Sequence, residues 1–443
     1  MGEPSPELPR FRQFMTTPPA SFPFRRRGYL HFDEPISKPA AVAIATAPET
    51  VASWSFLPFL RHDITLLRVE KDSAGQLQQR EPKDRPICYA SHKDAAIYAW
   101  YGAMLTARYE ERLNQLGLCE HVTAFRPAAG RCNLDYAGEV FDWIRQTGTG
   151  KAYAFDIRKF FDRLSHARLK SAWAELLGQP RLPDDHFAVF KSLTRFSYVR
   201  RDAAYRALGV SKHKPKANGR TRLCTPLEFR QLIRDGGLIE SNEEVFGIPQ
   251  GSPMSAVLSN LYMLQFDREL SGWVRERGGF YRRYCDDILI AMPESAITED
   301  VTGFVTQRIA EQELEIQPDK TTQHCFSLSG TGVALDKPLS YLGLVFDGAR
   351  VLLRPVGIAR YYTKMHRGVS LAGQTMRKWS KGEPIKRRKL FVLYSYVGRH
   401  NYPAYAFRAA RKLNSPAIKR QLKGHWRKLL KMIEKAQQKY GQE

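Results

Sequence analysis

The chain has 443 residues, of which 43% are hydrophobic and 12% aromatic, so it is long enough for two or three buried cores and is not a disordered protein. Its formal net charge of +24 favours a polyanionic partner, most commonly nucleic acid, although a merely soluble basic protein would carry the same charge. No apolar run reaches bilayer-spanning length and no export signal begins the chain, so we expect a cytoplasmic protein with no membrane partner. Six scattered cysteines indicate neither a zinc site nor a disulfide framework.

The folded body is expected to begin near the end of a polar connector, at about residue 84. Residues 1 to about 50 are rich in Pro and Ala, which predicts a segment that wraps over the surface or is partly disordered. A polar connector is expected at 70–84, and a short strand at 85–89 is followed by a helix that Ser91 can cap. A basic turn then carries Arg126 and Arg131, which can grip a triphosphate or simply keep the surface soluble.

Three carboxylates follow strands in the middle of the chain. Residues 151–155 alternate as a strand should, and Asp156 stands where that strand ends. Residues 280–292 read as a β-hairpin with Asp286 and Asp287 at its tip. Adjacent acids at a turn repel one another, so they are either an ordinary Asp-rich turn or part of a cation site. With Asp156 as the third member, the set suits two Mg²⁺ ions that support nucleotidyl transfer.

Two further segments precede the acidic hairpin in sequence, and one candidate residue, Lys320, follows it. Residues 163–246 form a long, mostly helical and basic insertion with an exposed loop at 212–220. The loop at 247–256 enters a helix for which Ser252 is the expected N-cap. Gln250 and Gly251 would precede that helix, where glycine permits close approach of a substrate and the Gln amide can contact a base or sugar. Lys320 follows a helix ended by proline and is either a solvated cation or a group that approaches pyrophosphate.

The positive charge is concentrated at the C-terminal end. Residues 351–443 contain 23 Lys or Arg against three Glu, a net charge of +20, whereas the preceding 350 residues contain 46 Lys or Arg against 42 acids. Aromatic residues are interleaved with these cations. We therefore predict three or four basic helices that track a phosphate backbone, with many of the aromatics in their core.

Taken together, these motifs resemble those of reverse transcriptases, in the family's order, over about residues 85–350. The Tyr-x-Asp-Asp motif is 284–287, the Asp-x-x-x-x-Phe-Asp motif is 156–162, and the Gln-Gly-Ser-Pro loop is 250–253. Lys320 matches the family's lysine, and 342–343 matches its Leu-Gly pair.

The resemblance implies roles for individual residues. Asp156 and Asp286 would bind both metal ions and Asp287 would complete the acidic site. Phe161 matches the ring that excludes ribonucleotides, and Lys320 would be a candidate general acid. Gln250 and Gly251, from the Gln-Gly-Ser-Pro loop, are further substrate-binding candidates, and Arg126 and Arg131 match the family's triphosphate-holding residues more loosely.

The family's fold implies an α+β right-hand polymerase with fingers, a ferredoxin-like palm and a basic α-helical thumb. The corresponding boundaries are an N-terminal extension at 1–80, fingers at 81–150, a palm at 151–350 with the helical insertion 163–246, and a thumb at 351–443. The solitary architecture and the motif at 85–92 resemble the bacterial defence-associated, formerly unknown-group enzymes, possibly of type 2. That likeness implies a structured noncoding RNA template, dNTP substrates, a cDNA product and a role against phage.

Two other functions stay open at this stage. One is a template-independent or protein-primed DNA polymerase of the abortive-infection type. The other is a non-catalytic RNA-binding scaffold, against which the intact acids argue. The RNA's identity, the priming group, the oligomeric state and the phage trigger are not encoded in any motif that we recognise.

Overall fold

The computed structural model describes the chain except residues 1–20, 72–76, 127–129, 331, 380–382 and 442–443. The chain divides into two compact units, each built from three segments. The first unit comprises residues 1–125, 157–269 and 306–316, and the second comprises 126–156, 270–305 and 317–443. Among the described residues, none of the helices combines the length and apolarity that crossing a bilayer requires.

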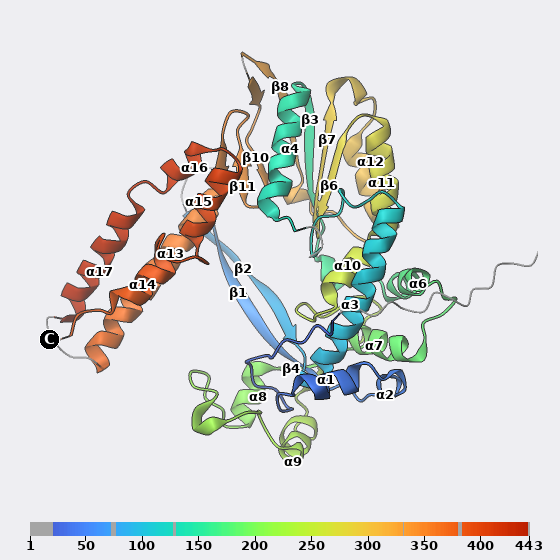
Figure 1. The fold of residues 1–443 in the computed structure, drawn as a ribbon, viewed down its shortest axis with the longest axis vertical. Helices are drawn as coiled ribbons and strands as arrows, with labels where there is room; N and C mark the ends of the chain where they lie inside the picture. The colour runs from blue at the N-terminus through green and yellow to red at the C-terminus, as the bar shows by residue number, and fades with distance from the viewer. Residues whose placement is uncertain (1–20, 72–76, 127–129, 331, 380–382, 442–443) are drawn as a thin grey trace, which may run out of the picture. The chain divides into compact units, whose positions relative to one another are not determined.

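A five-stranded antiparallel sheet organises the second unit (Figure 1). Its strand order is β6-β7-β3-β8-β9, and helices follow β3 and β7 in the chain, so that β3, β6, β7 and β8 have the predicted ferredoxin-like topology. The strands are β3 Gly150–Asp156, β6 Phe280–Tyr284, β7 Asp287–Pro293, β8 Thr322–Ser329 and β9 Gly332–Leu335.

Helix α4, Asn133–Thr147, covers this sheet and contributes to its apolar core. The same core includes a small sheet of β10 Leu339–Tyr341, β11 Leu344–Phe346 and β12 Val351–Leu353. The rings of Phe141 in α4 and Phe346 in β11 stack with their centroids 4.9 Å apart. The acidic hairpin is therefore built on a rigid, well-packed support.

The basic C-terminal segment forms five helices within its described part, rather than the three or four expected. Two of them join the core around the small sheet, and the other three share a second core. The helices are α13 Pro355–Trp379, α14 Arg387–Tyr394, α15 Tyr402–Lys412, α16 Pro416–Gln421 and α17 His425–Gly441.

The first unit combines a four-stranded sheet with helices from the N-terminal half and from the insertion. The sheet order is β2-β1-β4-β5, with β1 Phe59–Lys71, β2 Leu77–Tyr89, β4 Ser197–Arg200 and β5 Ile239–Ser241. Its helices are α1 Lys38–Ala45, α2 Pro48–Ala52, α3 His92–Gln115, α5 Phe160–Arg163, α6 His166–Leu176, α7 Asp184–Thr194, α8 Arg201–Ala207, α9 Pro226–Glu228 and α10 Ser255–Tyr262. Helices α11 Leu264–Glu276 and α12 Val301–Glu311 contribute residues to both units. The α+β class is thus confirmed, and residues 163–246 contain helices together with strands β4 and β5.

Two local predictions are wrong. The described residues of the predicted polar connector at 70–84, namely 70–71 and 77–84, instead belong to strands β1 and β2, which pair from Leu60 with Tyr89 to Lys71 with Leu77 with a register shift between Leu66 and Arg68. In residues 21–50, which were predicted to wrap over the surface or be partly disordered, Leu30 and Phe32 are buried; residues 1–20 lie outside the described part. Helix α10 begins at Ser255, so Ser252 caps a turn before the helix rather than the helix itself.

Candidate active site

The register of the five-stranded sheet places Asp156 directly opposite Asp287. They are the last Cα partners of the β3–β7 pair, and directly paired residues of antiparallel strands project from the same face. Tyr284 pairs with Asp287 across the β6–β7 hairpin, which leaves Cys285 and Asp286 as its two turn residues. All three predicted carboxylates therefore come from the ends of adjacent strands in one unit.

The hairpin turn is held from inside the protein. Cys285 has a φ of 60°, in the left-handed region, and its side chain is buried. The fully buried Arg283 donates a hydrogen bond from Nη1 to the Cys285 carbonyl oxygen, at 3.0 Å. Burial raises the pKa of the Cys285 thiol, so this side chain is neutral and contributes packing to the turn.

Negative charge is concentrated at Asp287. Burial and then the nearby Asp286 and Asp156 carboxylates raise the pKa of Asp287 to about 7, while Lys320 and Arg354 oppose that rise. Either a bound proton or a nearby cation relieves repulsion between carboxylates this close.

Lys320 is placed by the same strand end. Its Nζ donates a hydrogen bond to Oδ1 of Asp156, and it lies in a short 3₁₀ turn, Pro318–Lys320. The Gln317 amide before that turn donates to the Asp156 carbonyl oxygen at 2.7 Å. The lysine expected near pyrophosphate is therefore brought to the acidic site.

Two residues near Asp287 escaped sequence reasoning. Burial raises the pKa of Asp287, and the Arg354 guanidinium partly opposes that rise; the Arg354 backbone amide donates to the Gly343 carbonyl oxygen at 3.1 Å. The turn formed by Leu342 and Gly343, with φ values of 46° and 86°, thus holds Arg354 in place. In the sequence, Arg354 is one of 23 Lys or Arg residues in the C-terminal segment, and no motif distinguishes it from the others.

The second missed residue is Tyr341. Its hydroxyl is buried and, among the described residues, accepts or donates no hydrogen bond. Burial and the Asp287 charge raise the pKa of Tyr341, which places a neutral hydroxyl close to that carboxyl group. The sequence pattern around Tyr341 indicated only a strand and no functional role.

Metal binding is compatible with the chemistry of these side chains, although their arrangement is not that of a closed site. Carboxylate oxygens are the donors that Mg²⁺ prefers. Within the described ranges, however, no three His, Cys, Asp or Glu side chains converge closely enough to hold a metal ion. The ammonium group of Lys320 is instead bound to Asp156.

The two candidate arginines belong to the same unit but are not shown to join the acids. Arg131 forms an ion pair with Glu139, and its guanidinium group lies 4.9 Å from the ring centroid of Tyr136. Arg126 is half-buried and immediately precedes residues 127–129, which lie outside the described part. A role for either in holding a triphosphate stays a prediction.

Gln250, Gly251 and Phe161 lie together in the other unit. The Gln250 side chain donates from Nε2 to Oδ1 of Asp162 at 3.1 Å, and the Ile248 amide donates to the Phe161 carbonyl oxygen at 2.9 Å. The half-buried Phe161 contacts the buried ring of Phe160. The loop and the predicted sugar-selecting ring thus form one local structure.

Gly251 is required by the backbone of this loop. Its φ is 108°, and a Cβ atom there would lie 2.7 Å from the Cys88 carbonyl oxygen. The Cys88 amide donates in turn to the Gln250 carbonyl oxygen at 2.7 Å. Gly251 therefore lets the loop pack closely against the end of β2. The sequence had instead suggested that this glycine lets a substrate approach the backbone.

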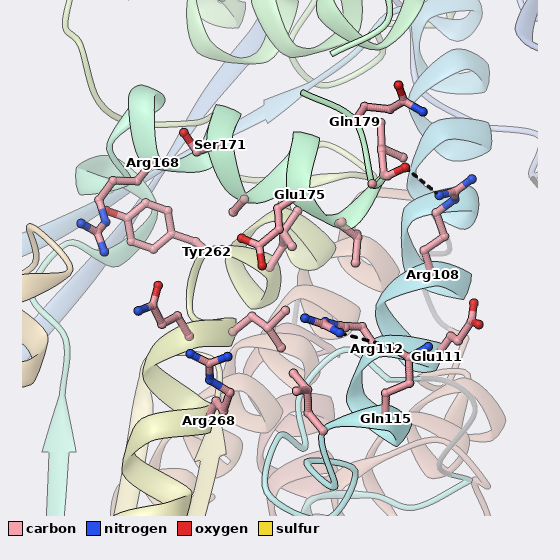
Figure 2. A pocket seen from close by; sticks show the side chains of 18 of the residues that line it. Arg108, Glu111, Arg112, Gln115, Arg168, Ser171, Glu175, Gln179, Tyr262 and Arg268 are labelled. Carbon is pink, nitrogen blue, oxygen red and sulfur yellow. Dashed lines mark hydrogen bonds between the residues drawn. The ribbon is translucent and has the colours of Figure 1, made fainter. Parts of the chain in front are cut away.

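A large cavity of about 1700 Å³ lies elsewhere in the first unit (Figure 2). Arg108 and Arg112 of α3, Arg168 of α6 and Arg268 of α11 surround it, together with Glu175. None of the predicted site residues lines this cavity. This large cavity is therefore not the acidic site.

Comparison with known families gives one extensive match. The model for reverse transcriptase (RNA-dependent DNA polymerase) matches residues 104–346, more than half of the chain. A curated relative, the Retron Mx65 reverse transcriptase of Myxococcus xanthus, is 33% identical over 72 residues. That segment is 16% of this chain and 17% of the relative, so the chain matches only a small part of it.

Similarity to solved structures is more distant. An apo telomerase from Candida tropicalis, truncated from its C-terminal domain, gives a TM-score of 0.38 at 9% identity, covering 71% of this chain and 59% of that one. Telomerase from Candida albicans, in complex with a TWJ fragment of telomeric RNA, gives a TM-score of 0.39 at 12% identity, covering 85% and 58%. The chain thus spans less than two thirds of either protein.

Proposed function

Since this chain belongs to the reverse transcriptase family, we propose that it is an RNA-directed DNA polymerase whose acidic site is Asp156, Asp286 and Asp287. The observation that carries the proposal is the register of β3 and β7, which pairs Asp156 with Asp287 and leaves Asp286 beside them in the turn. The family match includes all three residues. The ferredoxin-like sheet gives these carboxylates a fixed support.

The three carboxylates would hold divalent metal ions, which reverse transcriptases generally use, and Mg²⁺ is the ion that best suits oxygen donors. Such ions would activate a primer 3′-hydroxyl and stabilise the charge of the leaving pyrophosphate. The raised pKa of Asp287 supports this assignment, because a cation would relieve the repulsion from Asp286 and Asp156. Lys320 would leave Asp156 as the ions bind and would face the pyrophosphate, where it can donate a proton.

Other predicted residues would select the substrate. Phe161 would exclude a 2′-hydroxyl, and Gln250 would contact the base or sugar from a loop whose shape depends on Gly251. Arg126 and Arg131 would hold the triphosphate; for Arg131 this requires exchange of its Glu139 partner.

The template in this proposal is a structured noncoding RNA that is copied into cDNA in defence against phage. The net charge of +20 over residues 351–443 supports a long contact with a phosphate backbone. The bacterial relative is a retron enzyme, which supports the general class but not a particular group. Assignment to type 2 rests only on the resemblance of the motif at 85–92, the Tyr-Cys-Asp-Asp motif at 284–287 and the solitary architecture.

The test is dNTP incorporation on RNA copurified with the protein, with the double variant Asp286→Asn/Asp287→Asn. We expect incorporation to disappear while RNA affinity stays within about twofold, because charge neutralisation at the turn leaves the basic helices intact. Asp142→Asn, on the exposed face of α4, is the matched control and should retain activity. Full activity in the double variant would overturn the assignment.

Sequencing the product separates the proposal from the template-independent alternative. A cDNA complementary to the bound RNA supports templated synthesis. A product of random sequence would contradict it, and absence of any incorporation by the wild-type protein would favour a scaffold.

A further inference from the structure

A second cavity, of about 670 Å³, lies in the first unit and has an unusual lining. Three tyrosines reach it from separate segments: Tyr29 from the N-terminal extension, Tyr89 from the end of β2 and Tyr205 from α8. We call it the tyrosine cavity. None of the residues assigned to polymerisation lines this cavity. Most of its lining comes from the N-terminal extension and from the insertion at 163–246, to which the predicted motifs gave no role.

The aromatic walls are fixed by local contacts. Tyr29 donates a hydrogen bond to the Ala90 carbonyl oxygen at 2.7 Å and stacks on His92, with ring centroids 5.2 Å apart. The rings of Tyr29 and Tyr89 meet edge to face at 4.8 Å. These walls therefore need little rearrangement to receive a flat ring.

Cations complete the lining. Arg201 lies beside Tyr205 and is paired with Asp202 through one amino group, while its buried Nε has no hydrogen-bond partner among the described residues. Lys214 and Lys216 come from the exposed loop at 212–220, and within the described part of the chain neither forms an ion pair. The cavity thus has net positive charge next to aromatic surface.

The loop that supplies these lysines contains a hydrogen-bonded turn, and the chain just after the loop is bonded to the N-terminal extension. The Ala217 amide donates to the Lys214 carbonyl oxygen at 3.1 Å, and the Leu223 amide donates to the His31 carbonyl oxygen at 2.7 Å. Its neighbouring cation Lys212 is already paired with Asp202 at 2.7 Å. Of the cations that line the cavity, Lys214 and Lys216 are the exposed ones, so we assign the phosphate contacts to them.

We propose that the tyrosine cavity binds a nucleotide, with the base against the tyrosines and the phosphate on Lys214 and Lys216. Stacking on aromatic rings combined with lysine contacts to phosphate is how proteins hold unpaired nucleotides. The nucleotide belongs either to a single-stranded RNA or to a free nucleotide pool, and the chemistry of recognition is the same. This inference does not depend on the polymerase proposal.

The test uses the full-length protein and a 5-iodouridine-labelled single-stranded RNA roughly 12 nucleotides long. Photocrosslinks mapped by mass spectrometry should fall on Tyr29, Tyr89 or Tyr205. Tyr89→Leu should weaken crosslinking about fivefold or more, and Tyr89→Phe should restore it, because only the aromatic ring stacks. Crosslinks confined to other regions would overturn the proposal.

The phosphate contacts are tested by Lys214→Gln/Lys216→Gln. Loss of two contacts should reduce the slope of log affinity against log salt by roughly 1.4, at about 0.7 per phosphate of a single strand. Lys38→Gln/Lys191→Gln makes the same charge change at exposed lysines outside the cavity and should leave crosslinking unchanged. Equal effects of the two pairs would reject a specific site.

Two further arms identify the ligand and separate the proposals. Crosslinking that excess free ATP or UMP abolishes assigns a free nucleotide, whereas competition only by unlabelled RNA assigns an RNA strand. Asp286→Asn/Asp287→Asn should retain the tyrosine crosslinks. If the wild-type protein crosslinks there but incorporates no dNTP, the polymerase proposal fails alone.

Discussion

Lys320 donates a hydrogen bond to the carboxylate of Asp156, while the backbone before Lys320 is bonded to the carbonyl oxygen of the same aspartate. One strand end therefore positions both an acid and the cation proposed to meet the leaving group. The lysine side chain is 42% exposed, so it can exchange this partner for a substrate phosphate. We expect substrate binding to break the ion pair between Lys320 and Asp156.

Lys320→Ala should slow dNTP incorporation by about 10² to 10⁴-fold, because loss of a general acid removes a contribution of that order. Single-turnover kinetics with saturating dNTP measure this rate. Lys337→Ala, at an exposed lysine of the same unit, should behave as wild type. An unchanged rate in Lys320→Ala would show that Lys320 does not act as a general acid.

Gly251→Ala should destabilise the first unit by about 1 to 3 kcal/mol, because the new Cβ would meet the Cys88 carbonyl oxygen and φ is 108°. Chemical unfolding measures the loss. Gly272→Ala in α11 is the matched control, since its Cβ would enter open space, and it should be neutral or stabilising by about 0.5 to 1 kcal/mol. Equal stability of the two variants would refute the steric argument.

Much of the site was predictable because its motifs combine local patterning with fixed chain order. The α+β right-hand polymerase fold is confirmed by the family match, and the strand at 150–156 and the hairpin at 280–293 lie where alternation predicts them. Asp156 was recognised because it ends a strand. Its register opposite Asp287 is a long-range pairing that no local pattern encodes.

The unpredicted features depend on tertiary contacts. Cys285 is buried in the hairpin turn and Arg283 supports that turn from a fully buried position, although a basic residue normally predicts an exposed surface. Ser252 resembled an N-cap, but the helix starts at Ser255 after an additional turn. Arg354 could not be distinguished from neighbouring cations without the Gly343 contact.

Stability should fall as the pH is lowered from 6.5 to 4, partly because of His31. Burial lowers the pKa of His31 to about 4, from 6.5 in an unfolded chain. Nε2 donates to the Tyr89 carbonyl oxygen at 3.2 Å, whereas buried Nδ1 has no hydrogen-bond partner in the described residues. Over this range the unfolded state binds the proton more readily, so His31 would cost up to about 3 kcal/mol of folding free energy by pH 4.

Urea unfolding at several pH values checks the sign. His31→Gln removes the titrating group and should flatten the pH dependence, even if its stability at pH 7 is lower. His213→Gln, in the exposed loop, should preserve the wild-type slope. A slope that is the same in His31→Gln and wild type would exclude His31 as its source.

Phe161→Ala should admit ribonucleotides, because the bulky ring that opposes the 2′-hydroxyl is removed. The backbone of Phe161 accepts a hydrogen bond from Ile248, and that contact survives the substitution, so the Gln250 loop should keep its shape. The measurement is the ratio of catalytic efficiencies for a dNTP and the matching rNTP. We expect the ratio to fall by about tenfold or more, mainly through improved use of the rNTP.

The neighbouring ring provides the control for this substitution. Phe160 is buried and tilted against Phe161, with ring centroids 5.5 Å apart, so Phe160→Leu perturbs packing near the same loop without removing the half-buried ring of Phe161. It should lower stability while leaving the ratio of efficiencies unchanged, because a packing defect affects both nucleotides alike. If Phe161→Ala also leaves the ratio unchanged, sugar selection must come from another residue.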